Sequence, residues 1–171
     1  MAIRLLLISD THVPARSRRI PGDVWRAVDG ADVVVHAGDW VDTATLDALQ
    51  DRSARLVGVH GNNDGADLRA RLPEVARADI EGVRLAVIHE TGAAQGRERR
   101  IDATFADGPP DVLVFGHSHI PWDSVTPGGI RLLNPGSPTD RRRQPECTLM
   151  TAVVDGGELR DVRLAAVDRE S

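Results

Sequence analysis

The sequence predicts an α/β protein built from two β-sheets that pack face to face, with helices outside them. The first observation is that apolar runs alternate with helix-like segments up to residue 72, which is typical of crossover units and a parallel sheet. The second is a change of pattern at residues 75–88, where two strand-like runs flank a short turn. The third is a series of shorter strand patterns between residues 111 and 164. With 171 residues, a single domain over residues 1–171 with a sizeable core is expected.

The first half of the chain alternates between strands and helices. Its opening strand is a near-continuous apolar run, as expected for a central strand that is covered on both faces. Thr43 is a candidate N-cap for the second helix, and Pro73 ends the third helix. Strands are expected at Ile3–Ser9, Asp32–Ala37 and Leu56–Val59. Helices are expected at Gly22–Val28, Thr43–Gln50 and Asp67–Leu72.

The second half of the chain is dominated by strands. Glu81-Gly82 supplies the turn of the hairpin, and Asp155-Gly156-Gly157 is a strong turn between the last two strands. One helix is expected here, at Arg97–Phe105, after a loop at Glu90–Gly96. Strands are expected at Val75–Ile80, Val83–Ile88 and Asp111–Phe115, around Val125, and at Ile130–Leu133, Thr148–Val154 and Glu158–Leu164.

The composition excludes several classes of function. The net charge of -5 argues against bulk binding of nucleic acid or of an anionic membrane. Every basic residue is an arginine, so no Schiff-base or Walker-type lysine is available. Cys147 is the single cysteine and can form neither an internal disulfide nor a thiolate metal site. The chain has no stretch that approaches a membrane span and no signal-peptide pattern, so a cytoplasmic enzyme-sized domain is the expectation.

Metal-ligand side chains follow five of the expected strands. Imidazole is the commonest metal-binding side chain, and Gly116-His117-Ser118-His119 places two of them after the apolar run Val112–Phe115. Side chains two apart on an extended chain point the same way, so both histidines are expected to face one site. In such sheets, ligands gather beyond the carboxyl ends of the strands. The seven candidate metal ligands are Asp10, His12, Asp39, Asn62, His89, His117 and His119.

Seven ligands predict two metal ions rather than one. A zinc-type ion takes about four ligands, and a carboxylate can bridge two ions, so Asp39 is the expected shared ligand. Two ions of this kind form a clamp for a phosphoryl displacement. The oxygen and nitrogen donors, without sulfur, point first to Mn²⁺ and also suit Zn²⁺, Fe²⁺, Ni²⁺ or Co²⁺, whereas they make a poor calcium site.

The order of these motifs resembles that of the calcineurin-like metallophosphoesterase superfamily. The motifs are Asp-x-His, Gly-Asp, Gly-Asn-x-Asp, a single His and Gly-His-x-His, running from Asp10 to His119. Asn134-Pro135-Gly136-Ser137 is similar to the small bacterial and archaeal phosphodiesterase branch, which also contains the eukaryotic retromer subunit Vps29. The resemblance implies an αββα sandwich, that is, two mixed β-sheets flanked by helices.

The resemblance also implies a function. It implies hydrolysis of phosphate esters by a metal-bridging hydroxide, with a small phosphodiester or nucleotide-like substrate and with catalytic roles for Asp39, Asn62, His89 and His117. It implies a first metal on Asp10, His12, Asp39 and His119, and a second on Asp39, Asn62, His89 and His117. The alternatives are a non-catalytic, Vps29-like scaffold that binds protein partners, and a phosphomonoesterase or protein phosphatase. The sequence leaves the oligomeric state open, and an oligomer remains an option.

Asn63 departs from the pattern of the superfamily. Many members carry a histidine there that helps to protonate the leaving group or to hold the phosphate. Asparagine cannot act as a general acid, but it can donate a hydrogen bond to a phosphate oxygen, so good leaving groups are expected to be favoured. Arg16 is the second expected substrate contact, because its arginine cluster directly follows Asp10-Thr11-His12. The three arginine clusters are Arg16, Arg18, Arg19; Arg97, Arg99, Arg100; and Arg141, Arg142, Arg143.

Several other residues near the motifs allow two interpretations each. Glu90 points either to the rim of the site or to solvent. Asp64 either orients a ligand or caps the following helix. Asn134 is expected to make the turn before Pro135 rather than to contact the loop near His117. The remaining expectations are packing roles for Trp25, Trp40 and Trp122 (with a base-stacking rim as the alternative for the last two), satisfied hydrogen bonds for His36 and His60, and a helix N-terminal position for Asp42.

Overall fold

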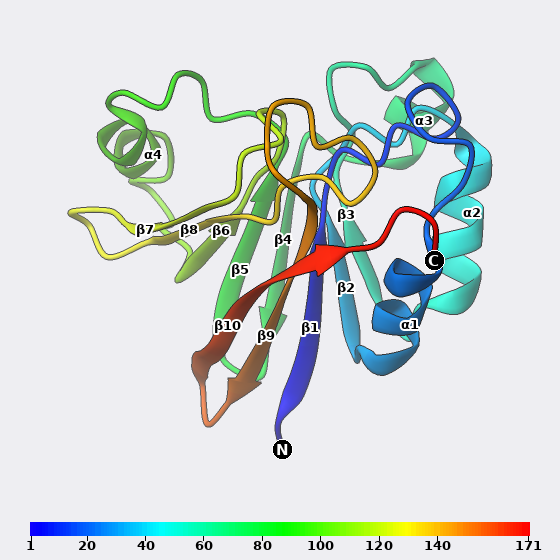
Figure 1. Ribbon diagram of the computed structural model, residues 1–171. Helices are drawn as coiled ribbons and strands as arrows, with labels where there is room; N and C mark the ends of the chain where they lie inside the picture. The colour runs from blue at the N-terminus through cyan, green and yellow to red at the C-terminus, as the bar shows by residue number, and fades with distance from the viewer.

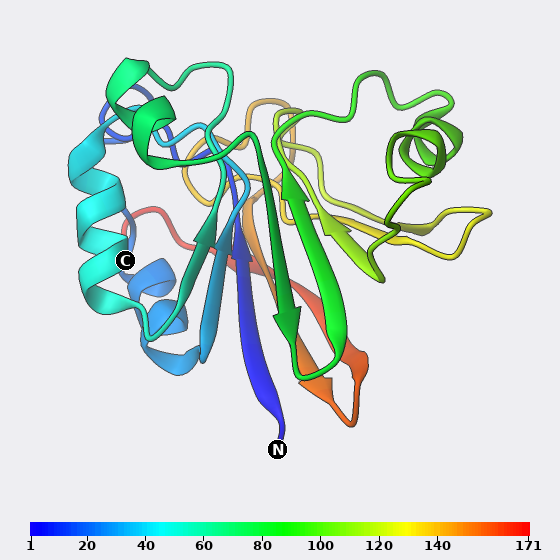
Figure 2. The ribbon, with the colours of Figure 1, turned by 180° about the vertical axis from the view of Figure 1, so that it is seen from behind.

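The computed structural model describes all 171 residues and shows two five-stranded β-sheets packed face to face (Figures 1 and 2). The first sheet contains β1 (Ile3–Ile8), β2 (Val33–His36), β3 (Leu56–Gly58), β9 (Cys147–Asp155) and β10 (Glu158–Val167). The second contains β4 (Val75–Ile80), β5 (Val83–Ile88), β6 (Val112–Val114), β7 (Trp122–Val125) and β8 (Arg131–Asn134). Their strand orders are β10-β9-β1-β2-β3 and β4-β5-β6-β8-β7.

Both sheets are mixed. In the first, β1, β2 and β3 are parallel, and β9 and β10 continue the sheet antiparallel beside β1. In the second, β5, β6 and β8 are parallel, and β4 and β7 form antiparallel edges. The expected hairpin is β4–β5, and the turn expected at Asp155-Gly156-Gly157 joins β9 to β10.

Four helices cover the outer faces of the two sheets. They are α1 (Gly22–Gly30), α2 (Thr43–Arg52), α3 (Ala66–Arg71) and α4 (Arg97–Thr104). Figure 1 shows α1, α2 and α3 on the side of the first sheet and α4 on the side of the second. The order of layers is therefore helix, sheet, sheet, helix, as expected from the resemblance. None of these helices combines the length and the apolar character that crossing a membrane requires.

Three buried clusters hold these layers together, and the two-residue period of the strands creates them. Leu5 and Leu7 of β1 point into the core between the sheets, where they meet Leu85 and Val87 of β5. Leu6 and Ile8 point to the other face. There they belong to a cluster with Val24 of α1, Leu46 of α2 and Leu68 of α3. On the outer face of the second sheet, Ile101 of α4 and Phe105, which follows α4, pack against Leu113 and Leu132.

The N-cap of α2 differs from the expectation. Asp42, not Thr43, is the N-cap, and its carboxylate accepts a hydrogen bond of 2.9 Å from the backbone N–H of Thr45. An N-cap residue has extended backbone and lies just before the helix, and Asp42 meets this condition with φ -126°. The expectation that Asp42 lies at a helix N-terminus is thus confirmed.

Candidate metal centre

All seven candidate ligands lie in loops at the same edge of the two sheets. Asp10 and His12 follow β1, and Asp39 follows β2. Asn62 lies in the loop after β3, and His89 directly follows β5. His117 and His119 lie in the loop after β6. Because β1, β2, β3, β5 and β6 are parallel within their sheets, their carboxyl ends bring these loops together, and the site spans the junction of the two sheets.

The expectation that His117 and His119 lie on extended chain is wrong. Five of the seven candidate ligands have backbone in the left-handed region, which costs free energy for a residue with a Cβ atom. Their φ angles are 56° at Asp10, 45° at His12, 60° at Asp39, 68° at His117 and 60° at His119. Strands β1 and β6 end before the ligands, so tight loops rather than strand alternation aim the side chains inward.

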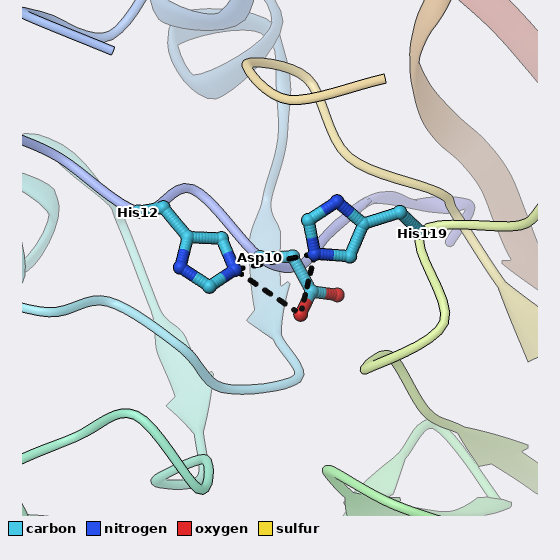
Figure 3. A group of neighbouring side chains, drawn as sticks. All are labelled: Asp10, His12 and His119. Atoms are coloured by element: carbon cyan, nitrogen blue, oxygen red, sulfur yellow. Dashed lines mark hydrogen bonds and ion pairs between the residues drawn. The ribbon is translucent and has the colours of Figure 1, made fainter. Parts of the chain in front are cut away.

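A first group of donor atoms gathers at the end of β1. His119 Nε2 lies 3.5 Å from Asp10 Oδ1, and His12 Nε2 lies 3.7 Å from the same oxygen. The two Nε2 atoms are 3.2 Å apart. Figure 3 shows both imidazoles turning a ring nitrogen towards the same oxygen of Asp10 and towards each other. All three residues are buried and lie within the range of one shared ion.

A second group lies beside the first and has Asp39 between them. Asp39 Oδ2 is 3.5 Å from His12 Nε2 and 3.4 Å from His89 Nε2, so it reaches one imidazole of each group. Asn62 Oδ1 lies 2.9 Å from His89 Nε2 and 3.0 Å from His117 Nδ1. Asp10 Oδ1 is farther from His89, at 4.0 Å. Asp39 is therefore the carboxylate placed most evenly between the two groups.

These separations fit a metal ion in each group. Two ligands that each lie about 2.1 Å from one tetrahedral ion are about 3.4 Å apart, close to the observed distances. Asp10 Oδ1 is buried and has no hydrogen-bond donor, although a buried carboxylate oxygen without a partner is costly. A cation would satisfy this oxygen. The donor set of carboxylates, imidazoles and one amide is also suited to divalent transition metals.

Hydrogen bonds fix the orientation of the ligand side chains. His89 Nδ1 lies 2.7 Å from the carbonyl oxygen of Ala37, and His119 Nδ1 lies 2.6 Å from that of Asp140. In each ring Nδ1 is therefore the donor, and Nε2 is the nitrogen that faces the site. The other oxygen of Asp10, Oδ2, accepts hydrogen bonds from Ser9 Oγ at 2.7 Å and from the backbone N–H of His117 at 3.0 Å.

The charges of the site are strongly coupled. Burial opposes ionisation of Asp39, but the hydrogen bond and charge of His89, with two hydrogen bonds from Asn63, hold the pKa of this carboxyl well below its usual value. Burial likewise opposes ionisation of Asp10, and its histidine neighbours more than offset this, so its pKa is also lowered. Burial lowers the pKa of His119, which favours the neutral, metal-binding form. Burial lowers the pKa of His89, but the carboxylates of Asp39 and Asp10 raise it by more, so the net shift is upward.

The sequence matches a known family over most of its length. The model of the calcineurin-like phosphoesterase superfamily domain matches residues 3–157. The chain belongs to this superfamily. It is 34% identical over 145 residues to a probable metallophosphoesterase of Methanocaldococcus jannaschii, covering 84% of this chain and 70% of that protein. A more distant protein of the same organism, named phosphodiesterase, is 19% identical over 129 residues, which cover 68% of this chain and 74% of that protein.

A solved structure shows the same fold at low sequence identity. Vps29 of Chaetomium thermophilum superposes with a TM-score of 0.80 at 20% identity, and the alignment covers 96% of this chain and 97% of that chain. The likeness confirms the arrangement of layers. The chain is thus a calcineurin-like phosphoesterase by family, and five of its candidate ligands form groups that could hold a metal ion.

Two glycines of the superfamily motifs make room for the ligands. A Cβ atom on Gly61 would meet the backbone nitrogen and the carboxylate of Asp39. A Cβ atom on Gly116 would meet Ser9 Oγ and Asp10 Oδ2. Any other residue at either position would displace a carboxylate ligand, so the glycines are required by close approach rather than by backbone freedom.

Asp64 organises two of the ligand loops. Its carboxylate is buried and accepts hydrogen bonds from the backbone N–H groups of Asp39 at 3.0 Å, Val41 at 2.8 Å and Gly61 at 2.7 Å. Of the two interpretations of Asp64, positioning is the one observed, because Gly65 is the N-cap of α3.

Asn134 also has a positioning role, contrary to the expectation of a turn alone. Its Nδ2 donates to Gly116 O at 3.0 Å and to Ser118 Oγ at 3.2 Å, while its Oδ1 accepts from Gly136 N at 2.9 Å. It therefore makes the turn and also contacts the histidine loop. Ser137, from the same motif, donates from Oγ to Asp10 O at 2.7 Å.

His36 and Trp40 are structural. His36 contacts Thr11 Oγ1 and the backbone N–H of Gly38, both at 3.1 Å, and burial lowers its pKa to about 3. Trp40 is fully buried, stacks on His36 and donates from Nε1 to Val59 O, so the alternative of a base-stacking rim is wrong for this residue.

The rim of the site carries groups of both charges. Glu90 points to the rim, where its Oε1 lies 3.7 Å from His117 Nε2. Arg142, of the third arginine cluster, donates to the carbonyl oxygen of His117 at 3.4 Å. The rim was one of the two interpretations given for Glu90, whereas the contact of Arg142 was not expected, because it joins loops that are distant in the chain. Arg16 lies exposed in the loop after His12, and its substrate contact stays a prediction.

Proposed function

We propose that the protein is a dinuclear metal-dependent phosphodiesterase. The observation that carries the proposal is that seven oxygen and nitrogen ligands from five loops converge, with separations that suit two ions and with a buried Asp10 oxygen that has no other partner. Membership of the phosphoesterase superfamily supports hydrolysis of a phosphate ester. The name of the distant relative from Methanocaldococcus jannaschii supports a diester.

In this proposal each group of ligands holds one divalent ion, with Mn²⁺ as the first expectation. The first ion would be bound by Asp10, His12 and His119, the second by Asn62, His89 and His117, and both by Asp39. When bound, two such ions lower the pKa of a coordinated water towards 7 and offset negative charge on phosphoryl oxygens.

The protein's own residues orient the reaction. Asp39 is held by two hydrogen bonds from Asn63, one from its backbone N–H at 2.9 Å and one from its Nδ2 at 2.7 Å. The amide group of Asn63 has a second hydrogen that is free to be donated to a phosphate oxygen, and Arg16 is the proposed cationic contact. Asn63 has no proton to give to a leaving group, so esters with good leaving groups are the proposed substrates.

Protein binding is the second candidate function. Its support is the likeness of the fold to Vps29. A protein that only binds partners does not need seven candidate metal ligands at one edge and a buried carboxylate oxygen without a partner. Enzymatic activity is therefore the better-supported function. The single domain over residues 1–171, the cytoplasmic location and the possibility of an oligomer stay predictions.

The test compares two chromogenic esters. Metal-stripped protein is assayed on bis-p-nitrophenyl phosphate and on p-nitrophenyl phosphate, alone and with added Mn²⁺, Zn²⁺ or Ni²⁺. We expect metal-dependent cleavage with a preference for the diester. A preference for the monoester would favour the phosphomonoesterase alternative. If the folded protein cleaves neither ester with any metal, the proposed enzymatic activity is wrong and the protein-binding scaffold is favoured.

A further inference from the structure

A cavity of about 380 Å³ lies beside the metal centre, on the side of α4. His117 and Ser118 of the ligand loop form one wall, so the cavity adjoins the centre directly. Ala93, Ala94 and Ile120 give it an apolar lining. The cavity is large enough for a substituent of a small ligand. None of the roles assigned above uses it.

Arg97 lines this cavity and is the one buried arginine of the chain, with 5% of its surface exposed. Its guanidinium lies over Trp122 and Phe115, with Cζ 4.4 Å and 4.8 Å from the two ring centroids. Its Nε donates to Thr91 Oγ1 at 2.8 Å, and its Nη2 donates to Gly92 O at 3.5 Å. The remaining nitrogen, Nη1, has no acceptor.

No carboxylate forms an ion pair with Arg97. Eight other arginines have such a partner within 4.0 Å, and all of them are more exposed. A buried cation without an anion is costly, because the interior does not replace the lost hydration. Burial, together with the charge of Arg100, lowers the pKa of Arg97. The aromatic rings and the neutral acceptors compensate only part of this cost.

We infer that the cavity beside His117 binds, through Arg97, a second anionic group of the substrate whose scissile phosphoryl group lies at the metal centre. The inference rests on the proposed function and narrows it to phosphoesters that carry a further phosphate or carboxylate. A guanidinium with a free N–H edge is the side chain best suited to either anion. The apolar lining accommodates the carbon chain that joins the two charged groups.

Two carboxylates near the cavity oppose an anion, and their positions limit the effect. Glu90 lines the cavity, but its side chain is 55% exposed and faces His117. Glu98 lies on α4 and accepts a hydrogen bond from Ser124 Oγ at 3.1 Å. Solvent screens an exposed charge far more than a buried one, so Arg97 dominates inside the cavity.

The first test measures anion binding without catalysis. Inorganic phosphate and, separately, acetate are titrated at constant ionic strength into the metal-free protein, with Nε–H of Arg97 and the indole N–H of Trp122 followed by ¹H–¹⁵N NMR. We expect saturable shifts of the Trp122 signal that are lost in Arg97→Met and kept in Arg99→Met. Arg99 is the matched control because it is exposed, lies on the same helix and has the same charge.

The second test measures specificity on diesters with one leaving group. The metal-loaded enzyme is assayed on p-nitrophenyl 2-carboxyethyl phosphate and on p-nitrophenyl propyl phosphate. We expect a kcat/KM about tenfold higher for the carboxylate, as for one charged hydrogen bond. The ratio of the two kcat/KM values should fall towards one in Arg97→Met and remain unchanged in Arg99→Met. Thermal unfolding of both variants checks that they are folded.

The outcomes separate the two proposals. If neither anion shifts the Arg97 and Trp122 signals, or if Arg97→Met keeps the carboxylate preference, Arg97 is a packing residue and the inference is wrong. Stronger shifts with phosphate than with acetate would identify a phosphate as the second group, and the reverse would identify a carboxylate. If no diester is cleaved, the proposed function fails, while the NMR titration still decides the anion site.

Discussion

Replacing Asp64 with asparagine tests whether the metal centre is preorganised by backbone hydrogen bonds. Asp64 joins the loops that follow β2 and β3, and the residue is 4% exposed. Its Oδ2 accepts from the backbone N–H groups of Asp39 and Gly61, and its Oδ1 accepts from that of Val41. Asp64→Asn keeps the volume and shape of the side chain but turns one of the two acceptors into a donor.

The expected cost follows from these three bonds. The asparagine oxygen can take the Oδ2 position, which leaves its NH₂ group facing the N–H of Val41. Loss of a hydrogen bond to a charged acceptor costs about 1.5–3 kcal/mol, and the two retained bonds weaken because their acceptor becomes neutral. Relief of a buried charge offsets part of this. We expect the free energy of unfolding to fall by about 2–4 kcal/mol, and the Tm by about 5–15 °C.

The assay is denaturant unfolding of the metal-free protein, followed by titration of Zn²⁺. Asp107→Asn is the control, because Asp107 is exposed and makes no hydrogen bond or ion pair. We expect affinity for Zn²⁺ to fall about 10–100-fold in Asp64→Asn only, as for partners that orient metal ligands. If Asp64→Asn matches Asp107→Asn in both stability and metal affinity, the loops are held by other contacts and the reasoning is wrong.

Three further predictions concern the centre itself. Asp39→Asn should abolish metal-dependent turnover and leave the circular dichroism spectrum unchanged; more than about a tenth of wild-type turnover would exclude a bridging role. Gly116→Ala should lower affinity for Zn²⁺ at least about tenfold, since its Cβ would meet Ser9 Oγ and Asp10 Oδ2; calorimetry with unchanged affinity would contradict this. Asn63→His should raise the rate on phenyl diesters relative to p-nitrophenyl diesters, and no change would place Asn63 outside the reaction path.

Sequence reasoning predicted the layers of the fold from local patterns. The alternation of Leu5, Leu6, Leu7 and Ile8 between two cores was implicit in a strand whose last four residues are all apolar. The ligand types were equally visible, because imidazole and carboxylate after an apolar run are local features. Their order also carried the resemblance that the family match confirmed.

Local patterns did not reveal how the ligands are aimed. His117 and His119 were expected to share one face of extended chain, whereas the structure has both in left-handed backbone beyond the strand. Such backbone is stable only when contacts elsewhere in the chain fix it. Asp64 and Asn134 supply these contacts to residues 25 and 18 positions away in the sequence. Hydrophobic periodicity describes only neighbouring residues, so it does not predict contacts at such separations.

The sequence by itself thus determined the fold class, the family and the candidate ligands, because each depends on residue type and on order along the chain. Asp39 was expected from the sequence as the shared carboxylate, but only the tertiary structure shows that its Oδ2 reaches both His12 and His89, since that depends on loops from different strands meeting at one edge. The tertiary structure also singled out Arg97. In the sequence this residue is one of three arginines in a charged cluster, and only packing between α4 and the second sheet buries it without a counter-ion.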